Sequence, residues 1–257
     1  MSKVALIRQP AGLGDIFWLQ PLVDHIASRG FTVIYPLCDH YYDMFSSSIV
    51  TNNSNFVRES DLDGKLLDTY SQTDHIIEDD FEYYPFDCIT DPTAKGFRDE
   101  YSSFSALERK YVYYRDINPD GTAVEPNWKD CIKIQRDFSR EKIYEDFCEI
   151  SSTDEYVWVN RVFGTPPGVV YRDIDLPENI KIVENLSLME NIFDVCGVLE
   201  KAKSIHTVET SFSWIIELLG IESDLNLYPR INRGEICTDH DYINSLYGDN
   251  WKKHGLS

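Results

Sequence analysis

The chain has 257 residues, with 24 Lys and Arg against 44 Asp and Glu, so its formal net charge is −20. This excess of negative charge repels phosphate backbones and anionic lipid head groups, which argues against a general nucleic-acid or membrane-surface binder. Because 42% of the residues are hydrophobic and 13% are aromatic, the chain has enough apolar surface to form a core and is not disordered as a whole.

The sequence shows neither a membrane-spanning segment nor a metal-binding motif. No window approaches the ~18 apolar residues that a span needs, and the first residues lack the basic region and cleavage site of a signal peptide. The 6 cysteines and 6 histidines are scattered, and Asp-x-Asp pairs occur as often as chance gives at this acidity. We therefore expect a cytoplasmic, reducing location, free thiols, no transmembrane segment, no metal and no bound cofactor.

The first 36 residues predict a β-α-β unit. Residues 4–7 form an apolar run typical of a strand buried on both faces, and residues 8–15 form a polar loop. Apolar residues at helical spacing then predict one helix that starts near Ile16 and stops at Gly30, with Pro21 close enough to its start to be tolerated. Residues 31–35 predict the second strand, parallel to the first.

The middle of the chain has a weaker pattern, and the second half again alternates strands with helices. Residues 75–77 and 88–90 are typical of short strands, 105–114 of a helix and 118–121 of a turn. A helix from residue 139 has Ile143, Phe147 and Ile150 on one face, and a polar junction follows at 151–154. Further strands are expected at 156–160, 169–171, 180–183, 205–208 and 225–228, and further helices at 189–202 behind a Ser187 cap, at 211–219 before Gly220, and at 239–253.

This alternation predicts an α/β protein with two Rossmann-like domains that face each other across a cleft. We place the N-terminal domain at residues 1–138 and the C-terminal domain at residues 139–257, with the last helix packing back on the body.

The loop Gly12-Leu13-Gly14-Asp15 is the first candidate site. It joins the first strand to its helix, where open α/β sheets bind ligands, and its glycines let the backbone approach a ligand closely. The dinucleotide fingerprint is incomplete, since Phe17 replaces its third glycine and Tyr35 its acidic residue, which disfavours a nicotinamide enzyme. The alternative is a tight turn with Asp15 as a helix cap.

The second candidate site is the segment from His206 to Ser211, which ends one strand and opens the next helix. The free amides of that helix, with the hydroxyls of Thr210 and Ser211, suit a diphosphate, and Glu209 suits a sugar hydroxyl. The alternative is an ordinary Ser/Thr cap.

A third candidate lies after the strand at 156–160. Asn160, Arg161 and Thr165 follow its carboxyl end, where an arginine can grip a phosphate with two donors. The alternative is an ion-paired arginine in a solvated loop.

Two of these segments resemble the two-Rossmann-domain glycosyltransferases of the GT-B fold, in particular the family of the bacterial heptosyltransferases (glycosyltransferase family 9). The matching residues are the Gly-x-Gly-Asp turn of Gly12, Gly14 and Asp15 with Gln20-Pro21 behind it, and the acidic-hydroxyl turn Glu209-Thr210-Ser211 behind a helix and strand. The chain departs from the family where it has Ser213-Trp214 in place of a histidine, and Glu209 in place of aspartate.

The resemblance implies a metal-independent glycosyltransferase of the hexosyl or heptosyl type in glycan biosynthesis. Asp15 would be the general base on the acceptor side, with Gly12, Leu13 and Gly14 shaping its loop. The donor, a nucleotide-sugar, would lie on Asn160, Arg161, Thr165, His206, Glu209, Thr210 and Ser211. The acceptor would be a glycan, a lipid or a protein, and a carboxylate base suggests inversion of the sugar. The alternatives are a non-catalytic nucleotide- or glycan-binding protein of the same fold, and another nucleotide-dependent α/β enzyme such as an epimerase or oxidoreductase.

Overall fold

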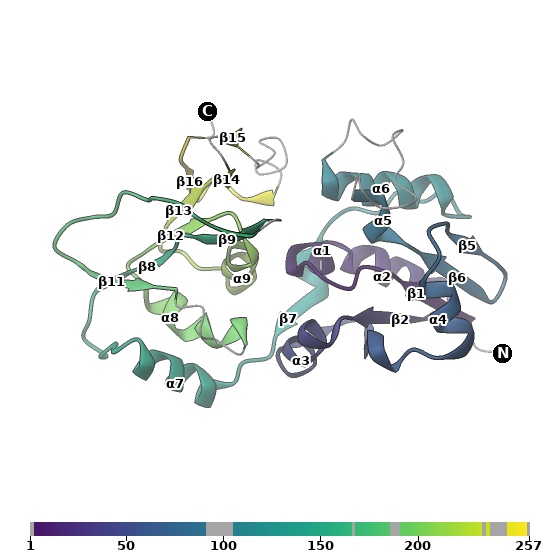
Figure 1. Cartoon of the computed structure of the whole chain (residues 1–257), viewed down its shortest axis with the longest axis horizontal. Coiled ribbons are helices and arrows are strands. Elements are labelled where there is room, and N and C mark those ends of the chain that lie inside the picture. Colours follow the sequence, from purple (N-terminus) through teal and green to yellow (C-terminus); the bar gives the residue numbers. More distant parts are fainter. Residues whose placement is uncertain are drawn as a thin grey trace. The chain divides into compact units, whose positions relative to one another are not determined.

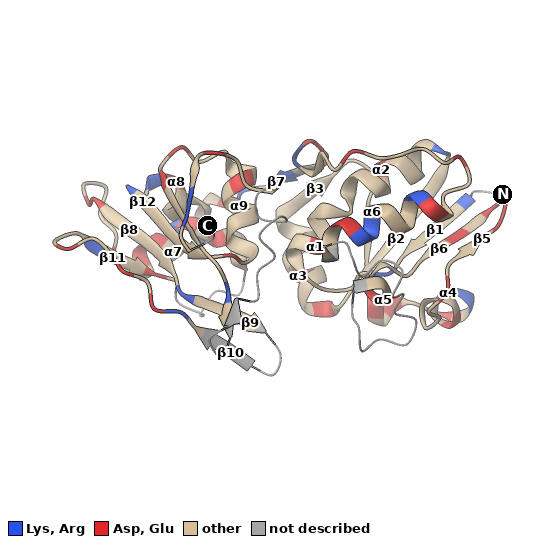
Figure 2. Cartoon of the chain, turned by 90° about the horizontal axis from the view of Figure 1, so that it is seen from above, with Lys and Arg blue, Asp and Glu red and all other residues tan. Residues whose placement is uncertain are grey.

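The protein, a computed structural model, forms two compact units, Met1–Lys133 (unit 1) and Ile134–Ser257 (unit 2), shown in Figure 1. The structure describes residues 3–90, 105–165, 168–185, 191–232, 235–236 and 246–255. The division between the units falls five positions before the predicted boundary at 138/139. Asp and Glu are spread over the loops and helices of both units, with Lys and Arg dispersed among them (Figure 2).

Unit 1 is built on a five-stranded sheet in the order β4-β2-β1-β6-β5. All neighbouring pairs in it are parallel except β5 with β6, and β1 lies at its centre. A two-stranded pair of β3 and β7 is separate from it. The strands are β1 Lys3–Ile7, β2 Phe31–Leu37, β3 Ile49–Thr51, β4 Asn55–Arg58, β5 Ile76–Ile77, β6 Phe81–Tyr84 and β7 Ile132–Ile134.

Alternate residues of β1 and β6 are buried against different helices, so apolar residues point to both faces of the sheet; the buried Glu82 in β6 is ion-paired with Arg29. Leu6 and Tyr83 pack with Tyr70 of helix α4 (Gly64–Tyr70) in one hydrophobic cluster. On the opposite face Tyr84 contacts Tyr114 of helix α6 (Ala106–Ile117) at 5.5 Å between ring centroids. A sheet with helices on both faces confirms the predicted α/β class for this unit.

The predicted first helix is wrong in one respect, because it is two helices, α1 (Leu13–Trp18) and α2 (Gln20–Ser28). Pro21 has no N–H and lies in the first turn of α2, so the backbone ladder is interrupted there. The side chain of Gln20 compensates, since its Nε2 donates to the carbonyl of Ile16 at 2.9 Å.

Two further expectations concern the middle of the chain. Residues 88–90, expected as a strand, belong to helix α5 (Phe86–Thr90), because Pro85 ends the strand before it and suits the start of a helix. The expected helix at 105–114 is confirmed as α6, which Ser105 and Glu108 start with a reciprocal capping box. The remaining helices of unit 1 are α3 Asp39–Ser48 and the short 3-10 turns η1 Glu59–Asp61 and η3 Trp128–Cys131.

Unit 2 is built on a parallel five-stranded sheet in the order β11-β8-β12-β13-β16. Helices α8 (Cys196–Lys201) and α9 (Ser211–Leu219) lie on one face, where Trp158 of β8 meets Phe212 of α9 at 5.2 Å between centroids. The sheet strands are β8 Tyr156–Asn160, β11 Lys181–Glu184, β12 Ser204–Val208, β13 Asp224–Tyr228 and β16 Trp251–Lys253. The hairpins pair β9 Val162–Thr165 with β10 Gly168–Tyr171, and β14 Ile231–Asn232 with β15 Glu235–Ile236.

Helix α7 (Phe138–Phe147) forms as predicted, but the predicted buried face is wrong. Ile143 is 69% exposed and Phe147 is 51% exposed, while Glu141 and Tyr144 are buried. Glu141 is buried, and its carboxylate is bound by Arg136 just before the helix. Ion pairs rather than an apolar stripe join α7 to the rest of unit 2, since Arg140 pairs with Asp194 and Glu145 with Lys201.

The structure corrects part of two helices expected in unit 2, at 189–202 and at 239–253. The helix expected at 189–202 is α8 preceded by a 3-10 turn, η4 (Ile192–Val195), which Asn191 caps; Ser187 lies outside the described residues. The helix expected at 239–253 is wrong at its end, where residues 251–253 form β16 beside β13. Trp251 is a strand-favouring residue that follows a Gly-Asp-Asn turn, and residues 239–245 lie outside the described part.

Candidate functional site

In unit 1 the strand order reverses at β1, which has β2 on one side and β6 on the other. The chain leaves neighbouring strands in opposite directions at such a point, and ligands of open α/β sheets bind beyond the carboxyl ends of the strands there. The loops after β1 and β6 are tied together, since Arg8 Nε lies 3.0 Å from Asp87 Oδ2 and the Asp87 amide donates to the Arg8 carbonyl. The Gly12–Asp15 loop therefore stands at the expected ligand-binding edge.

Gly12 has to be glycine for two reasons. Its φ of +87° is a left-handed backbone conformation that other residues adopt at a cost. A Cβ built on Gly12 would also lie 2.5 Å from Asp15 Oδ2, so the Asp15 carboxylate occupies the space that a side chain would take.

Asp15 is not the helix cap of the alternative interpretation. The N-cap of α1 is Gly12, and within the described residues 3–90 no side chain caps this helix. Asp15 Oδ1 instead forms an ion pair with Nζ of Lys110, which comes from α6, 95 positions along the chain. The Asp15 side chain is 34% exposed, so the carboxylate is anchored at one oxygen and still reaches solvent.

Lys110 is fully buried, with 0% of its side chain exposed. Its ammonium also donates to Gln9 Oε1 at 2.7 Å, and Gln9 Nε2 in turn donates to the carbonyl of Ala11 at 2.7 Å. Burial lowers the pKa of Lys110, and the charge of Asp15 opposes that effect.

Sequence reasoning missed Lys110, although a signal existed. Lys110 lies three positions after Leu107 and three and four before Tyr113 and Tyr114, all of which are buried. A lysine on the apolar face of an amphipathic helix is unusual and indicates a buried partner of opposite charge.

Two tyrosines interact with Gly12 and Asp15 of this site. The hydroxyl of Tyr41, on α3, hydrogen-bonds to the backbone of Gly12, and burial raises the pKa of this hydroxyl. Tyr35 within β2 is fully buried, which raises its pKa, and the charge of Asp15 adds to the shift. Both phenols therefore stay protonated at neutral pH.

In unit 2 the strand order reverses between β8 and β12, which have β11 and β13 on their outer sides. Asn160 is the last residue of β8, and its side chain is fully buried. Its Nδ2 donates to Thr207 Oγ1 at 3.2 Å and to Thr210 Oγ1 at 3.1 Å, and its Oδ1 accepts from Asn185 Nδ2 at 3.1 Å. The structure thus brings the predicted residues Asn160 and Thr210 into contact.

The Ser/Thr-cap alternative is wrong for this helix. Thr210 is the N-cap of α9 by position, yet among residues 191–232, which the structure describes, its hydroxyl forms no capping hydrogen bond. Asn160 holds that hydroxyl instead. Ser211 is the first residue of α9, and Ser213, two residues on, bonds to Tyr247 OH at 2.7 Å and donates to the Thr210 carbonyl at 2.6 Å.

Glu209 and His206 are both buried and have partners within unit 2. Glu209 Oε2 lies 2.6 Å from Arg230 Nε, so this carboxylate is ion-paired. His206 Nδ1 lies 3.1 Å from Tyr228 OH, and burial lowers the pKa of His206 to about 4, which keeps the imidazole neutral at pH 7.

Arg161 matches the ion-paired alternative more closely than an open phosphate site. Its side chain is 12% exposed, with Nε 3.1 Å from Glu184 Oε1 and Nη1 donating to the Ile174 carbonyl at 2.8 Å. The segment expected as a loop is strand β9, whose last residue, Thr165, pairs with Gly168 of β10.

Arg172, which the sequence analysis does not single out, stands close to the same edge. Its guanidinium lies 5.9 Å from the ring centroid of Tyr228, the last residue of β13. Its Nε is buried and has no hydrogen-bond partner among the described residues. No spacing rule identifies such a residue, because the chain reaches it through the β9–β10 hairpin.

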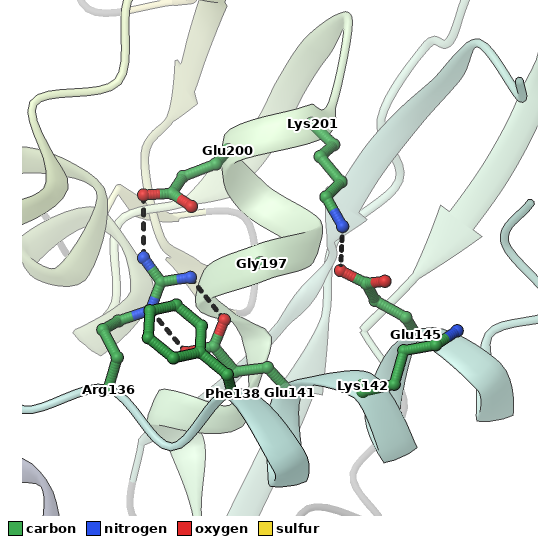
Figure 3. A pocket seen from close by; sticks show the side chains of 8 residues that line it. All are labelled: Arg136, Phe138, Glu141, Lys142, Glu145, Gly197, Glu200 and Lys201. Atoms are coloured by element: carbon green, nitrogen blue, oxygen red, sulfur yellow. Dashed lines mark hydrogen bonds and ion pairs between the residues drawn. The ribbon is translucent and has the colours of Figure 1, made fainter. Parts of the chain in front are cut away.

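A hollow of about 250 Å³ lies between α7 and α8, and none of the predicted site residues lines it. Figure 3 shows Arg136 between Glu141 and Glu200, and Lys201 reaching Glu145. A Cβ on Gly197 would lie 2.8 Å from Glu141 and 2.9 Å from Glu145, so this glycine lets the two helices approach. The charged groups that line the hollow are all paired, either with one another or, for Lys142, with Asp146, and the hollow is explained by helix packing.

Within the described ranges, no group of three or more His, Cys, Asp or Glu residues is arranged to hold a metal ion.

Comparison with known proteins finds likeness in fold only. No family model matches the chain, and no curated protein matches it in sequence. Similar solved structures are the glycosyl transferase family 9 from Veillonella parvula DSM 2008 (TM-score 0.47, 10% identity, 89% of this chain and 81% of that chain covered) and E. coli heptosyltransferase WaaC with ADP-2-deoxy-2-fluoro heptose (0.43, 12%, 97% and 92%). A third is the iron-containing dodecameric glycosyltransferase TibC from enterotoxigenic E. coli H10407 (0.47, 10%, 92% and 61%).

Two of these proteins carry the name of the family or enzyme type that the Gly12–Asp15 and Glu209–Ser211 segments resemble. Since every TM-score is below 0.5, these likenesses carry no argument about activity.

Proposed function

We propose that this protein is a glycosyltransferase that moves a sugar from a nucleotide-sugar donor to an acceptor hydroxyl. One observation carries the proposal. At the strand reversal of each unit a helix begins without a side-chain cap in the described residues. The first polar side chain at that start is held by another group instead, Asp15 by Lys110 and Thr210 by Asn160.

In unit 1, Asp15 is the general base. The acceptor hydroxyl transfers its proton to the carboxylate while the acceptor oxygen attacks the anomeric carbon of the donor sugar. The bond from that carbon to the donor diphosphate breaks, and the electron pair leaves with the diphosphate. A single carboxylate on the attacking side favours direct displacement, and so inversion of the anomeric centre.

In unit 2, the start of α9 binds the leaving diphosphate. The first amides of a nine-residue helix and its dipole both favour negative charge, so the site needs no metal to stabilise the charge that develops. Ser211 and Thr210 supply hydroxyls beside it, and Glu209 accepts from a sugar hydroxyl.

Two arginines are candidates for the cation that neutralises the leaving group. Arg161 would have to exchange Glu184 for a phosphate, whereas Arg172 has a buried Nε with no partner among the described residues. We therefore add Arg172 to the predicted donor set of Asn160, Arg161, Thr165, His206, Glu209, Thr210 and Ser211.

The acceptor class and a cytoplasmic location are also part of this proposal. A glycan, lipid or protein hydroxyl fits the chemistry of Asp15. No helix in the described part of the chain has the length and apolar character that crossing a bilayer requires.

Thermal unfolding against a panel of nucleoside diphosphates, nucleotide-sugars and nicotinamide cofactors tests the proposal. A ligand at a hundred times its dissociation constant adds about 2.7 kcal/mol to the folded state, a shift of several degrees. The panel is repeated on Arg172→Met, with Lys203→Met as the matched control, because Lys203 is an exposed cation paired with Glu155.

A shift with one nucleotide class that Arg172→Met loses and Lys203→Met keeps supports the donor site. The selected nucleotide-sugar is then incubated with acceptors, and release of the free nucleoside diphosphate in proportion to acceptor measures transfer. Binding without product supports the non-catalytic alternative, and a shift with a nicotinamide cofactor supports an oxidoreductase or epimerase. No shift with any nucleotide contradicts the proposed function.

A further inference from the structure

The buried ammonium of Lys110 is the feature of unit 1 that folding alone does not explain. Removing a charged group from water costs several kcal/mol, and an ion pair with a one-third exposed carboxylate returns only part of this cost. A methionine or leucine of similar volume would fill the space at no such cost. Such unfavourable groups concentrate at sites where their charge is used.

The contacts of Lys110 show what the charge holds. Its Nζ binds Gln9 Oε1 and Asp15 Oδ1, the side chains at the two ends of the glycine loop. Gln9 also binds the carbonyl of Ala11 inside that loop. The buried Lys110 ammonium therefore links the two ends of the loop from residue 9 to residue 15.

The same contacts divide the roles of the two Asp15 oxygens. Oδ1 faces Lys110, while Oδ2 lies over Gly12, where a Cβ would stand. In the described part of the chain no hydrogen bond to Oδ2 is present, so this oxygen is left to accept a proton. With the carboxylate fixed at one oxygen, the other has a defined direction.

We propose that Lys110 is a positioning residue for the transfer reaction, which fixes Asp15 so that Oδ2 faces the acceptor hydroxyl. The proposal rests on the proposed function of Asp15 as the base. It predicts that the charge of Lys110 acts on the chemical step and not on donor binding.

The first test compares Lys110→Met, Lys110→Arg and Arg115→Met in the full-length protein. Misplacing a reacting group by about 1 Å costs roughly 100-fold in rate, so Lys110→Met should lose about 100-fold in kcat with the donor KM unchanged. Lys110→Arg keeps the charge and should recover at least about tenfold of that loss. Arg115→Met removes an exposed cation from the same helix and should change neither constant.

The second test is an unfolding cycle that needs no activity. Asp15→Asn leaves the Lys110 ammonium buried without its counter-ion, and Lys110→Met removes that ammonium. The midpoint of the double variant should therefore fall by less than the sum of the two single losses. If Lys110→Met alone does not fold, Lys110→Arg still tests the effect on rate, and the double variant still tests whether the two stability losses are coupled.

The results separate the two claims. Folded Lys110→Met with wild-type kcat, or additive midpoint losses, overturns the positioning role while Asp15 can still be the base. A wild-type protein that transfers no sugar overturns the proposed function, and a coupled midpoint would then reveal a structural ion pair only.

Discussion

Asp15 in unit 1 and Thr210 in unit 2 stand at equivalent places in two similar sheets, yet different chemistry holds them. Asp15 is a charge held by a buried charge, Lys110. Thr210 is a neutral hydroxyl held by the neutral amide of Asn160, which Asn185 holds in turn.

The difference separates two kinds of site. A fixed carboxylate with one oxygen exposed to solvent is suited to taking a proton. A helix start surrounded by neutral amides keeps its positive field for an anion, because the neighbouring carboxylate of Glu209 is paired with Arg230. Unit 1 therefore has the chemistry of a base, and unit 2 that of an anion site.

The largest expected effect comes from removing the base. Asp15→Asn should lower kcat by about 10²- to 10⁴-fold, the usual contribution of general-base catalysis, and leave the nucleotide affinity within about twofold. Steady-state transfer and calorimetric titration measure the two quantities. Asp68→Asn removes an exposed carboxylate of α4 and serves as the control. If folded Asp15→Asn transferred sugar undiminished, Asp15 would not be the base, and the chemical distinction between unit 1 and unit 2 would fail.

The loop beneath Asp15 offers a matched pair of glycines. Gly12 and Gly30 have φ values of +87° and +89°, but only the Cβ on Gly12 meets a neighbour, Asp15 Oδ2 at 2.5 Å, while nothing lies within 4 Å of the other. Gly30→Ala should cost about 1–2 kcal/mol of unfolding free energy, the backbone cost alone. Gly12→Ala should cost more and also lower kcat. Equal losses in urea unfolding, with transfer intact, would show that Asp15 does not depend on this glycine.

The neutral state of His206 in unit 2 predicts a pH dependence of the free energy of unfolding. The pKa of His206 is about 4 in the folded chain and 6.5 in the unfolded chain. Between these two pKa values, His206 is protonated in the unfolded chain and neutral in the folded chain. Stability is therefore lost as pH falls from about 6.5 to 4. The loss from His206 is at most about 3 kcal/mol. Urea unfolding of wild type and His206→Gln at pH 7 and pH 5 measures it, and an equal pH dependence of both would contradict it.

The smallest expected effect has opposite signs in stability and binding. Ser211→Asp adds a carboxylate to the first turn of α9, which should stabilise the protein by about 0.5 kcal/mol through the helix dipole. The same charge should repel a diphosphate and weaken its binding at least about tenfold. Ser139→Asp in the first turn of α7 should give the stability change without the binding change. Unchanged nucleotide affinity in Ser211→Asp would place the anion elsewhere.

Much of the fold follows from local sequence, because local backbone preferences act between near neighbours. The apolar run of β1, the helix expected at 105–114, which is α6, and the Gly220 end of α9, where φ is +62°, are all confirmed. The failures arise where a distant partner overrides the pattern. Asp194 and Lys201 pair with Arg140 and Glu145 and hold α7 with its apolar residues exposed, and β13 pairs with residues 251–253.

The candidate site divides in the same way. Neighbouring residues are enough to predict a glycine turn and a hydroxyl turn after two buried strands, because turn formation and strand burial depend on local residue types. The partners of those turns come from distant parts of the chain. Lys110 reaches Asp15 across 95 positions, and Asn160 reaches Thr210 across 50. These pairings depend on how helices and strands pack in three dimensions, which no local spacing records.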